Sequence, residues 1–303
     1  MKDIFDIVRE WKKRRREKLA VATLVRAEGS SYRRPGARML VCGDGKTVGS
    51  LSAGCIEEEV AHRALEVLRT GNPALISFDT RKRFGCAGKI DIFIERAPEN
   101  FFIDLAENLD ARCPCVAITR FSGEGMGTRM TEFDHDHPGT LVQKIHPPIR
   151  LFIFGVGRDS APLHLFANSF GWEIFDIVDA NELPIAPDKW TAAIVKSHNY
   201  GHDFAALQKL LPLDLRYVGL IGPRKRRNRL LSDLLDLGVT SNAGFFSPAG
   251  MDLGAETPEE IALAIISEIQ RVFGGGSGES LRERKLPIHR TMACRDTSAL
   301  SKR

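Results

Sequence analysis

The sequence predicts an α/β protein with two domains and a tail. We expect residues 1–147 to form an N-terminal α+β domain with mixed strands, residues 148–273 a doubly wound parallel-sheet domain, and residues 274–303 a mobile tail. Three observations predict this division. Short apolar runs separated by Gly, Pro, Asp and Asn dominate the first half, whereas strands alternate with helices in the second. The last residues are rich in glycine and charge, a composition that does not bury a core.

The first half begins with an amphipathic helix. Ile4, Val8 and Trp11 share one face, and residues 11–18 carry six basic residues and one acid. We interpret this run as a solvated helix face and not as a nucleic-acid patch, because few aromatic residues accompany the charges. Two further helices are predicted over residues 56–69 and 101–109, and strands over residues 20–27, 37–42, 74–79, 89–95 and 115–121.

The pattern changes after a turn at residues 134–140 and a linker at residues 146–150. Strand-like and helix-like stretches then alternate, as expected for right-handed βαβ crossovers and a parallel sheet. The predicted strands begin at residues 151, 172, 191 and 217. Four helices are predicted: one that ends near residue 170, one over residues 204–211, one that ends near residue 237, and one that begins at residue 258. Thr257-Pro258-Glu259-Glu260 is a capping box, which we interpret as structural.

Composition and charge limit the classes of function. The chain has 43% hydrophobic and 27% charged residues, and its formal net charge of +4 is too small to demand a nucleic-acid partner. Without a signal-like segment or an apolar run of about 20 residues, we expect a cytoplasmic protein with no membrane partner. The six cysteines are then expected to be free, and the absence of a CxxC spacing disfavours structural zinc. His135, Asp136 and His137 could hold a metal, but adjacent polar residues in a turn are more often solvated.

Gly155-Val156-Gly157-Arg158-Asp159-Ser160 follows a strand and opens a helix, which is the context of a Rossmann-like nucleotide fingerprint. Gly155 permits the tight turn, Gly157 lets the backbone approach a phosphate, and Ser160 takes the third small position. Asp179 lies 22 residues after Gly157, where an acid binds ribose hydroxyls. These residues predict a phosphate-bearing ligand. The alternative is a Rossmann-like domain that keeps the turn for packing, and Asp159 favours it because a carboxylate repels an anion.

A second strand–glycine–helix segment covers residues 220–231 and places Arg224, Lys225, Arg226 and Arg227 in the first turns of a helix. Cations at a helix N-terminus oppose the macrodipole, so an anion or an acidic neighbour would relieve them. The alternative is a basic helix that faces solvent.

Two cysteines lie in glycine-containing loops. Cys55 lies near the positive end of the helix that follows it, which favours a thiolate, whereas the glutamates at residues 57–59 oppose one. Cys86, between Gly85 and Gly88, has basic neighbours and no nearby acid, so it is the better candidate for a reactive thiolate. For each cysteine the alternative is a small residue that fits a tight loop.

Several segments together carry a family resemblance. In chain order they are VATLVRAEGSSYRRPGARMLV, VGSLSAGCIEE, FGCAGKIDIFIE, IFGVG, IVDA, SHNYGHDF, YVGLIGPRKRR and SPAGMDLGAETPEEIALAI. Over nearly the whole length, this order resembles the xanthine dehydrogenase accessory factors, or XdhC/CoxI proteins. The sequence departs from the family at Ala53 and Ala87, where glycine is frequent. His198 and Asp203 match its His and Asp after a strand, with a hydrogen-bonded loop histidine as the alternative.

The resemblance implies a maturation factor for molybdenum hydroxylases, a carrier and not an enzyme. Such proteins bind the molybdenum cofactor (molybdopterin), protect it during sulfuration and deliver it to a xanthine dehydrogenase-like apoenzyme. A cysteine desulfurase is a further expected partner, and we expect a homodimer. Cys55 and Cys86 would lie near the metal, because soft thiolates suit it, and a nucleotide is a further expected ligand at the Rossmann-like loop. The alternative function is an NAD(P)-dependent oxidoreductase using Gly155, Gly157 and Asp179, although the sequence offers no evident proton relay beyond His198.

Overall fold

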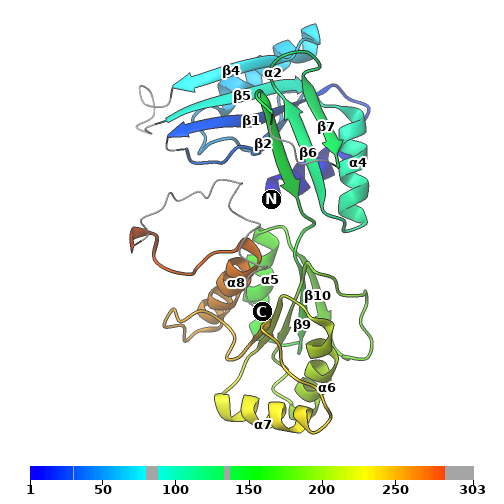
Figure 1. The fold of residues 1–303 in the computed structure, drawn as a ribbon, viewed down its shortest axis with the longest axis vertical. Coiled ribbons are helices and arrows are strands. Elements are labelled where there is room, and N and C mark those ends of the chain that lie inside the picture. Colours follow the sequence, from blue (N-terminus) through cyan, green and yellow to red (C-terminus); the bar gives the residue numbers. More distant parts are fainter. Residues whose placement is uncertain (30, 80–87, 133–136, 284–303) are drawn as a thin grey trace. The chain divides into compact units, whose positions relative to one another are not determined.

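The structure is a computed structural model that describes residues 1–29, 31–79, 88–132 and 137–283. The chain divides into two compact units, Met1–Pro148 and Ile149–Arg303 (Figure 1). Of the expected mobile tail, residues 284–303 lie outside the described residues, and a short 3-10 turn covers Leu281–Glu283. Among the helices of the described ranges, none has the length and apolar character that crossing a bilayer requires.

The first unit contains two antiparallel sheets. The larger has the strand order β3-β2-β1-β5-β4, and the smaller has the order β7-β6-β8. The strands are β1 (Leu19–Gly29), β2 (Arg38–Cys42), β3 (Thr47–Gly49), β4 (Ala74–Asp79), β5 (Gly88–Arg96), β6 (Cys115–Arg120), β7 (Gly127–Thr131) and β8 (Thr140–Ile145). The helices are α1 (Lys2–Lys13), α2 (Glu57–Thr70) and α4 (Glu99–Asp110). The predicted α+β architecture is confirmed, and the strand pairs described in it are antiparallel.

Both faces of the larger sheet are covered, because successive side chains of a strand point to opposite faces. Ala20, Ala22 and Leu24 of β1 pack in one apolar cluster with α2. Leu19 and Val21 pack in another with α1 and α4. Because both faces of the sheet are covered, the first seven residues of β1 are all buried, and six of these seven are apolar, with Thr23 the exception.

The second unit is a five-stranded parallel sheet of order β10-β9-β11-β12-β13. Its strands are β9 (Arg150–Phe154), β10 (Glu173–Ile177), β11 (Thr191–Val195), β12 (Tyr217–Leu220) and β13 (Phe245–Phe246). The connecting helices are η1 (Arg158–Ser160), α5 (Ala161–Ser169), α6 (Tyr200–Leu210), η2 (Leu211–Leu213), α7 (Arg224–Leu235) and α8 (Pro258–Gly274). The predicted doubly wound fold is confirmed: Leu151 and Ile153 pack with α5 and α8, and Phe152 and Phe154 pack with α6 and α7.

The strand order creates a switch point in the second unit. β9 is the first strand of the unit in the chain, and it lies between β10 on one side and β11 on the other. Where the order of an open parallel sheet reverses, the loops after the two strands leave on opposite faces and open a crevice at their carboxyl ends. This edge is therefore the place to examine the segments that follow β9, β10 and β11.

Candidate functional site

Gly155 begins the turn after β9. Its φ is 105°, and a Cβ added there would lie 2.5 Å from the Cα of Ser197. A left-handed φ favours glycine, and the close approach excludes any side chain. The first glycine of the predicted fingerprint therefore lets the end of β9 lie directly against the segment that follows β11.

Gly157 is followed by a carboxylate that folds back over it. A Cβ added at Gly157 would lie 2.5 Å from Oδ1 of Asp159 and 3.7 Å from Nζ of Lys196. Lys196 Nζ donates to Asp159 Oδ1 at 2.7 Å, and the Lys196 side chain is only 2% exposed. Sequence reasoning missed Lys196, because it ends an apolar run that is typical of a buried strand. A lysine directly after a parallel strand, at the edge where ligands bind, is the signal that would have found it.

The ion pair fixes the charge of the loop. Burial raises the pKa of the Asp159 carboxyl, but the hydrogen bond from Lys196 and the charge of Lys196 together lower that pKa by more, so the net shift is downward. Asp159 is therefore ionised at neutral pH, and Lys196 neutralises it. The sequence pointed to an isolated carboxylate that repels anions, whereas the structure contains a matched pair.

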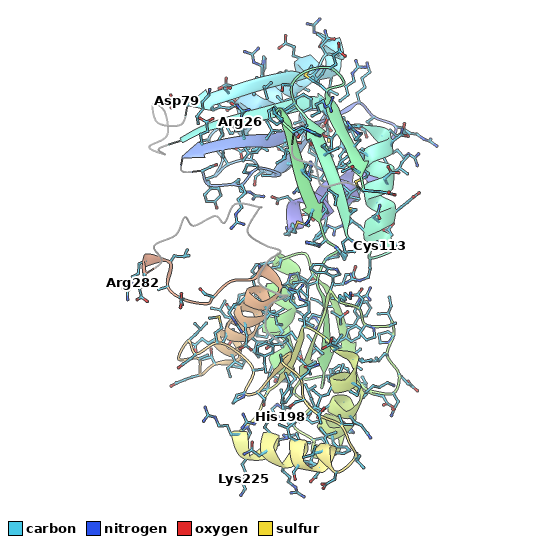
Figure 2. All side chains as sticks on the ribbon, viewed as in Figure 1. Arg26, Asp79, Cys113, His198, Lys225 and Arg282 are labelled. Atoms are coloured by element: carbon cyan, nitrogen blue, oxygen red, sulfur yellow. The ribbon has the colours of Figure 1, made fainter. Side chains whose placement is uncertain are left out.

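His198, which Figure 2 labels in the second unit, lies close to this pair. Its backbone has a φ of 56°, its side chain is 72% exposed, and its Nε2 lies 3.8 Å from Asp159 Oδ2. The preceding turn is held by Asp203, which is fully buried and accepts hydrogen bonds from the backbone N–H and the hydroxyl of Ser197. Asp203 also pairs with Arg226 of α7 at 2.5 Å. An acidic neighbour thus relieves one of the basic residues at the start of α7, while Arg224 and Lys225 are exposed.

Asp179 follows β10 at the same edge of the sheet. It is exposed, and its Oδ1 accepts a hydrogen bond from the backbone N–H of Asn181 at 2.8 Å. Gly155, Gly157, Asp179 and His198 therefore all follow the carboxyl ends of neighbouring strands, β9, β10 and β11.

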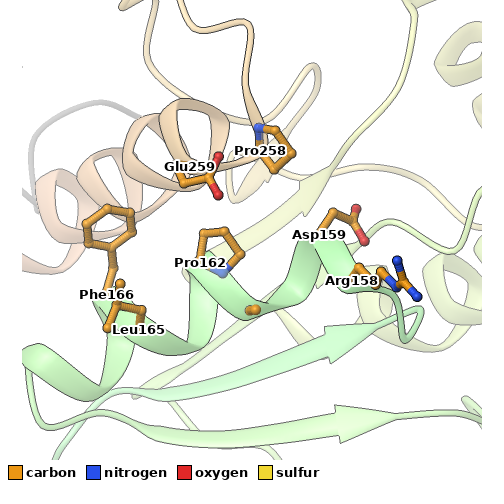
Figure 3. A pocket seen from close by; sticks show the side chains of 8 residues that line it. Arg158, Asp159, Pro162, Leu165, Phe166, Pro258 and Glu259 are labelled. Carbon is orange, nitrogen blue, oxygen red and sulfur yellow. The ribbon is translucent and has the colours of Figure 1, made fainter.

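A shallow groove lies beside the ion pair, between α5 and the start of α8 (Figure 3). Arg158 and Asp159 lie at one end of it, and Leu165 and Phe166 lie toward the other (Figure 3). Leu165 is 68% exposed. The groove thus combines an apolar wall with a polar end, and many small-molecule sites likewise have a mostly apolar lining with a few polar groups.

In the first unit, Cys55 lies in a loop that is fixed by its neighbours. The carboxylate of Glu57 accepts hydrogen bonds from the backbone N–H groups of Leu51, Ser52 and Ile56, and from the Ser52 hydroxyl. The Ser52 oxygen in turn accepts from the N–H groups of Gly54 and Cys55. Burial raises the pKa of Glu57, but these hydrogen bonds together lower it more strongly, so the net shift is downward. Cys55 itself is exposed.

Helix α2 begins at Glu57, with Ile56 as its N-cap, so Cys55 lies directly before the N-terminus of the helix, as the sequence predicts. Glu57 also holds the preceding loop through its side chain, a role that the sequence did not predict for any of the three glutamates. That bonding pattern, a carboxylate that reaches back to the N–H groups before its own helix, resembles one half of a capping box.

The remaining predicted thiol site cannot be placed beside Cys55. Gly85 and Cys86 lie outside the described residues, while Gly88 begins β5, is buried and pairs with Gly29 across the ladder. His135 and Asp136 also lie outside the described residues, and His137 is exposed. Within the described ranges, the structure gathers no group of three or more His, Cys, Asp and Glu side chains that could hold a metal ion.

Comparisons with known proteins agree with the two units. Residues 13–79 match the model of the XdhC and CoxI family, and residues 151–269 match that of the XdhC Rossmann domain. A Bacillus subtilis protein described as a probable subunit of xanthine dehydrogenase is 29% identical over 84% of this chain and 92% of its own length. The Escherichia coli molybdenum cofactor insertion chaperone PaoD is 24% identical over 83% of this chain and 82% of its own.

A solved structure has a similar fold. The crystal structure of a xanthine dehydrogenase from Bacillus halodurans matches with a TM-score of 0.77, over 93% of this chain and 98% of that one, at 24% identity. At this identity the likeness concerns the fold alone.

Proposed function

The chain belongs to the XdhC and CoxI family, and from that premise we propose that it is an accessory factor for a molybdenum hydroxylase. In this proposal it binds the molybdenum cofactor, protects it while the metal is sulfurated, and delivers it to the apoenzyme. It acts as a carrier and not as an enzyme. The similarity to a relative named as a molybdenum cofactor insertion chaperone supports this function.

The observation that carries the proposal is the exposed thiol of Cys55 on a loop held in place by Glu57. A soft thiolate suits the molybdenum end of the cofactor, which is the redox-active centre that the hydroxylase uses when it is loaded. A metal ligand is most useful where its backbone is fixed by neighbouring hydrogen bonds. Glu57 and Ser52 provide that support, so the donor chemistry fits the metal end. We propose Cys86 as a second thiol at the metal.

The second unit offers a separate place for a phosphate-bearing group. Lys196 supplies positive charge and His198 a hydrogen-bond donor, and Gly157 places no side chain of its own beside Lys196. We propose that this edge binds a phosphate-bearing ligand, with Asp179 available for the hydroxyls of a ribose if the ligand is a nucleotide.

Cofactor retention tests the function. Purified protein is mixed with the molybdenum cofactor and passed through a gel-filtration column, and molybdenum bound per chain is measured by mass spectrometry. We expect the wild type to retain the metal and the Cys55→Ser, Cys86→Ser double variant to retain at least tenfold less. Cys113→Ser is the matched control, because Cys113 is also an exposed cysteine of the first unit.

Equal retention by the wild type and the double variant would remove the thiols from the site, and lack of retention by the wild type would contradict the proposed function.

Partners are tested with the same loaded protein. We expect transfer of molybdenum to a hydroxylase apoenzyme, binding of a cysteine desulfurase, and a homodimer in analytical ultracentrifugation.

A further inference from the structure

The Asp159 carboxylate lies where the phosphate of a bound nucleotide would be expected. In a fingerprint loop the second glycine lets a phosphate approach the backbone. Here that space is taken by the chain itself, because Asp159 Oδ1 lies 2.5 Å from the position of a Cβ on Gly157. The same oxygen accepts the hydrogen bond from Lys196. An internal anion thus occupies the cradle formed by Gly157 and Lys196.

Lys196 requires such an anion. Its side chain is 2% exposed, and an ammonium group removed from water is costly unless it is paired. Asp159 provides this anion through a contact that can be broken and remade, because its own side chain is 39% exposed and it lies in a three-residue 3-10 turn. A rotation of Asp159 toward solvent costs little if another anion takes its place on Lys196.

We propose that Asp159 is a counter-ion held in place of the ligand's phosphate, and that the ligand of this site displaces it with a terminal phosphate monoester. The inference rests on the proposed function only in assuming a phosphate-bearing ligand at this edge. It adds that the chain's own carboxylate competes with that ligand, and that this competition favours ligands with a terminal phosphate.

The charges explain the selection. A phosphate monoester carries a charge of about −1.5 to −2 at pH 7, so it brings more negative charge to Lys196 and His198 than the carboxylate it replaces. Each phosphate of a dinucleotide's pyrophosphate is a diester-like group with a single negative charge. Exchanging one single charge for another yields little Coulomb energy. The site therefore favours a terminal phosphate over a bridging pyrophosphate.

Calorimetric titration of the full chain with AMP, NAD⁺ and adenosine tests this inference. AMP carries a terminal phosphate, NAD⁺ carries a bridging pyrophosphate, and adenosine carries neither. We expect the wild type to bind AMP more tightly than NAD⁺. In Asp159→Asn, we expect AMP affinity to rise at least tenfold and the preference over NAD⁺ to narrow. Lys196→Met should abolish the contribution of the phosphate, so that AMP binds no better than adenosine.

Asp176→Asn is the matched control, because Asp176 is a carboxylate of the same sheet that pairs with His164. It should leave AMP affinity unchanged. Asp159→Ser, with a neutral side chain too short to reach Lys196, repeats the test if Asp159→Asn does not fold, and thermal melts verify folding. Unchanged or weaker AMP binding in a folded Asp159 variant overturns the inference, as does full AMP binding by Lys196→Met.

The same proteins are assayed for cofactor retention. Retention by the wild type without a gain in AMP affinity in Asp159→Asn rejects the counter-ion and leaves the carrier function intact. A tenfold gain in AMP affinity in Asp159→Asn, with no cofactor retention by the wild type, supports the counter-ion and rejects the carrier function.

Discussion

The loop around Cys55 and the loop after Gly155 use a carboxylate in opposite ways. In the first unit Glu57 accepts hydrogen bonds from the backbone that precedes it, within six residues of its own position, and the Cys55 thiol stays exposed. In the second unit Asp159 pairs with Lys196, which is 37 residues away, and fills the loop. A carboxylate that bonds to neighbours in the sequence holds the backbone of its loop in one conformation. A carboxylate that pairs with a distant lysine instead sets the net charge of its loop.

The largest expected effect tests how far the second loop depends on close approach. Gly155→Ala should cost about 3 kcal/mol of unfolding free energy, because the left-handed φ and the contact with Ser197 both oppose a Cβ. Gly238→Ala is the control: its φ is 75°, but a Cβ there meets open space among the described residues, so it should cost only about 1 kcal/mol. Urea denaturation measures both. Equal losses would show that φ alone matters and that the approach of Ser197 does not.

Removal of Glu57 tests the first loop. Glu57→Ala deletes an acceptor of backbone hydrogen bonds at Leu51, Ser52 and Ile56, and we expect a loss of about 2 kcal/mol. Glu58→Ala, one residue further along the same helix end, should cost only a few tenths of a kcal/mol through the helix dipole. A similar loss for both variants in urea titrations would reduce Glu57 to a general helix-end acid.

Thiol reactivity compares the exposed Cys55 with a less exposed cysteine of the same unit, Cys115. Burial raises the pKa of Cys115, in the same unit, to about 11. Since the thiolate is the nucleophile, Cys115 should react with iodoacetamide at pH 8 at least tenfold more slowly than Cys55. Mass spectrometry of peptides over time gives both rates. A Cys115 rate close to that of Cys55 would contradict the burial of this thiol.

The smallest effect is the acid dependence of the two carboxylates. Hydrogen bonds lower the pKa of Glu57 below 4.5, and Lys196 lowers that of Asp159 below 3.8. A lowered folded-state pKa contributes stability that is present above the unfolded pKa and is lost as the pH falls through the folded one. The stability difference between wild type and Glu57→Ala should therefore begin to shrink below pH 4.5, and that between wild type and Asp159→Asn only below pH 3.8. Urea titrations between pH 6 and pH 3 measure both. A difference that stays constant over this range would exclude an ionised carboxylate as its source.

The same contrast between short and long range separates the features that could be predicted from those that were missed. The turn after β9 and the capping box at Thr257 depend on neighbours in the chain, and the structure contains both. Polar or very short strands, such as β3 and β7, were missed because their apolar pattern is too brief to be recognised.

The candidate site was predicted less completely than the fold. Gly155, Gly157, Asp179 and His198 could be named because each follows a recognisable strand. Lys196 could not, because its role depends on a carboxylate far away in the chain that reaches it only when β9 and β11 are neighbours. Cys86 stays a prediction.

The buried carboxylate of Asp203 has a consequence for local opening. Asp203 accepts a hydrogen bond from the backbone N–H of Ser197 and pairs with Arg226, so it connects the turn that carries His198 to α7. The Ser197 amide should then exchange its hydrogen with deuterated water only when this tie is broken, at a rate set by a sub-global opening and not by surface fraying. Slow exchange at Ser197, accelerated in Arg226→Met, would make this one amide a reporter of how tightly the edge of the sheet is held.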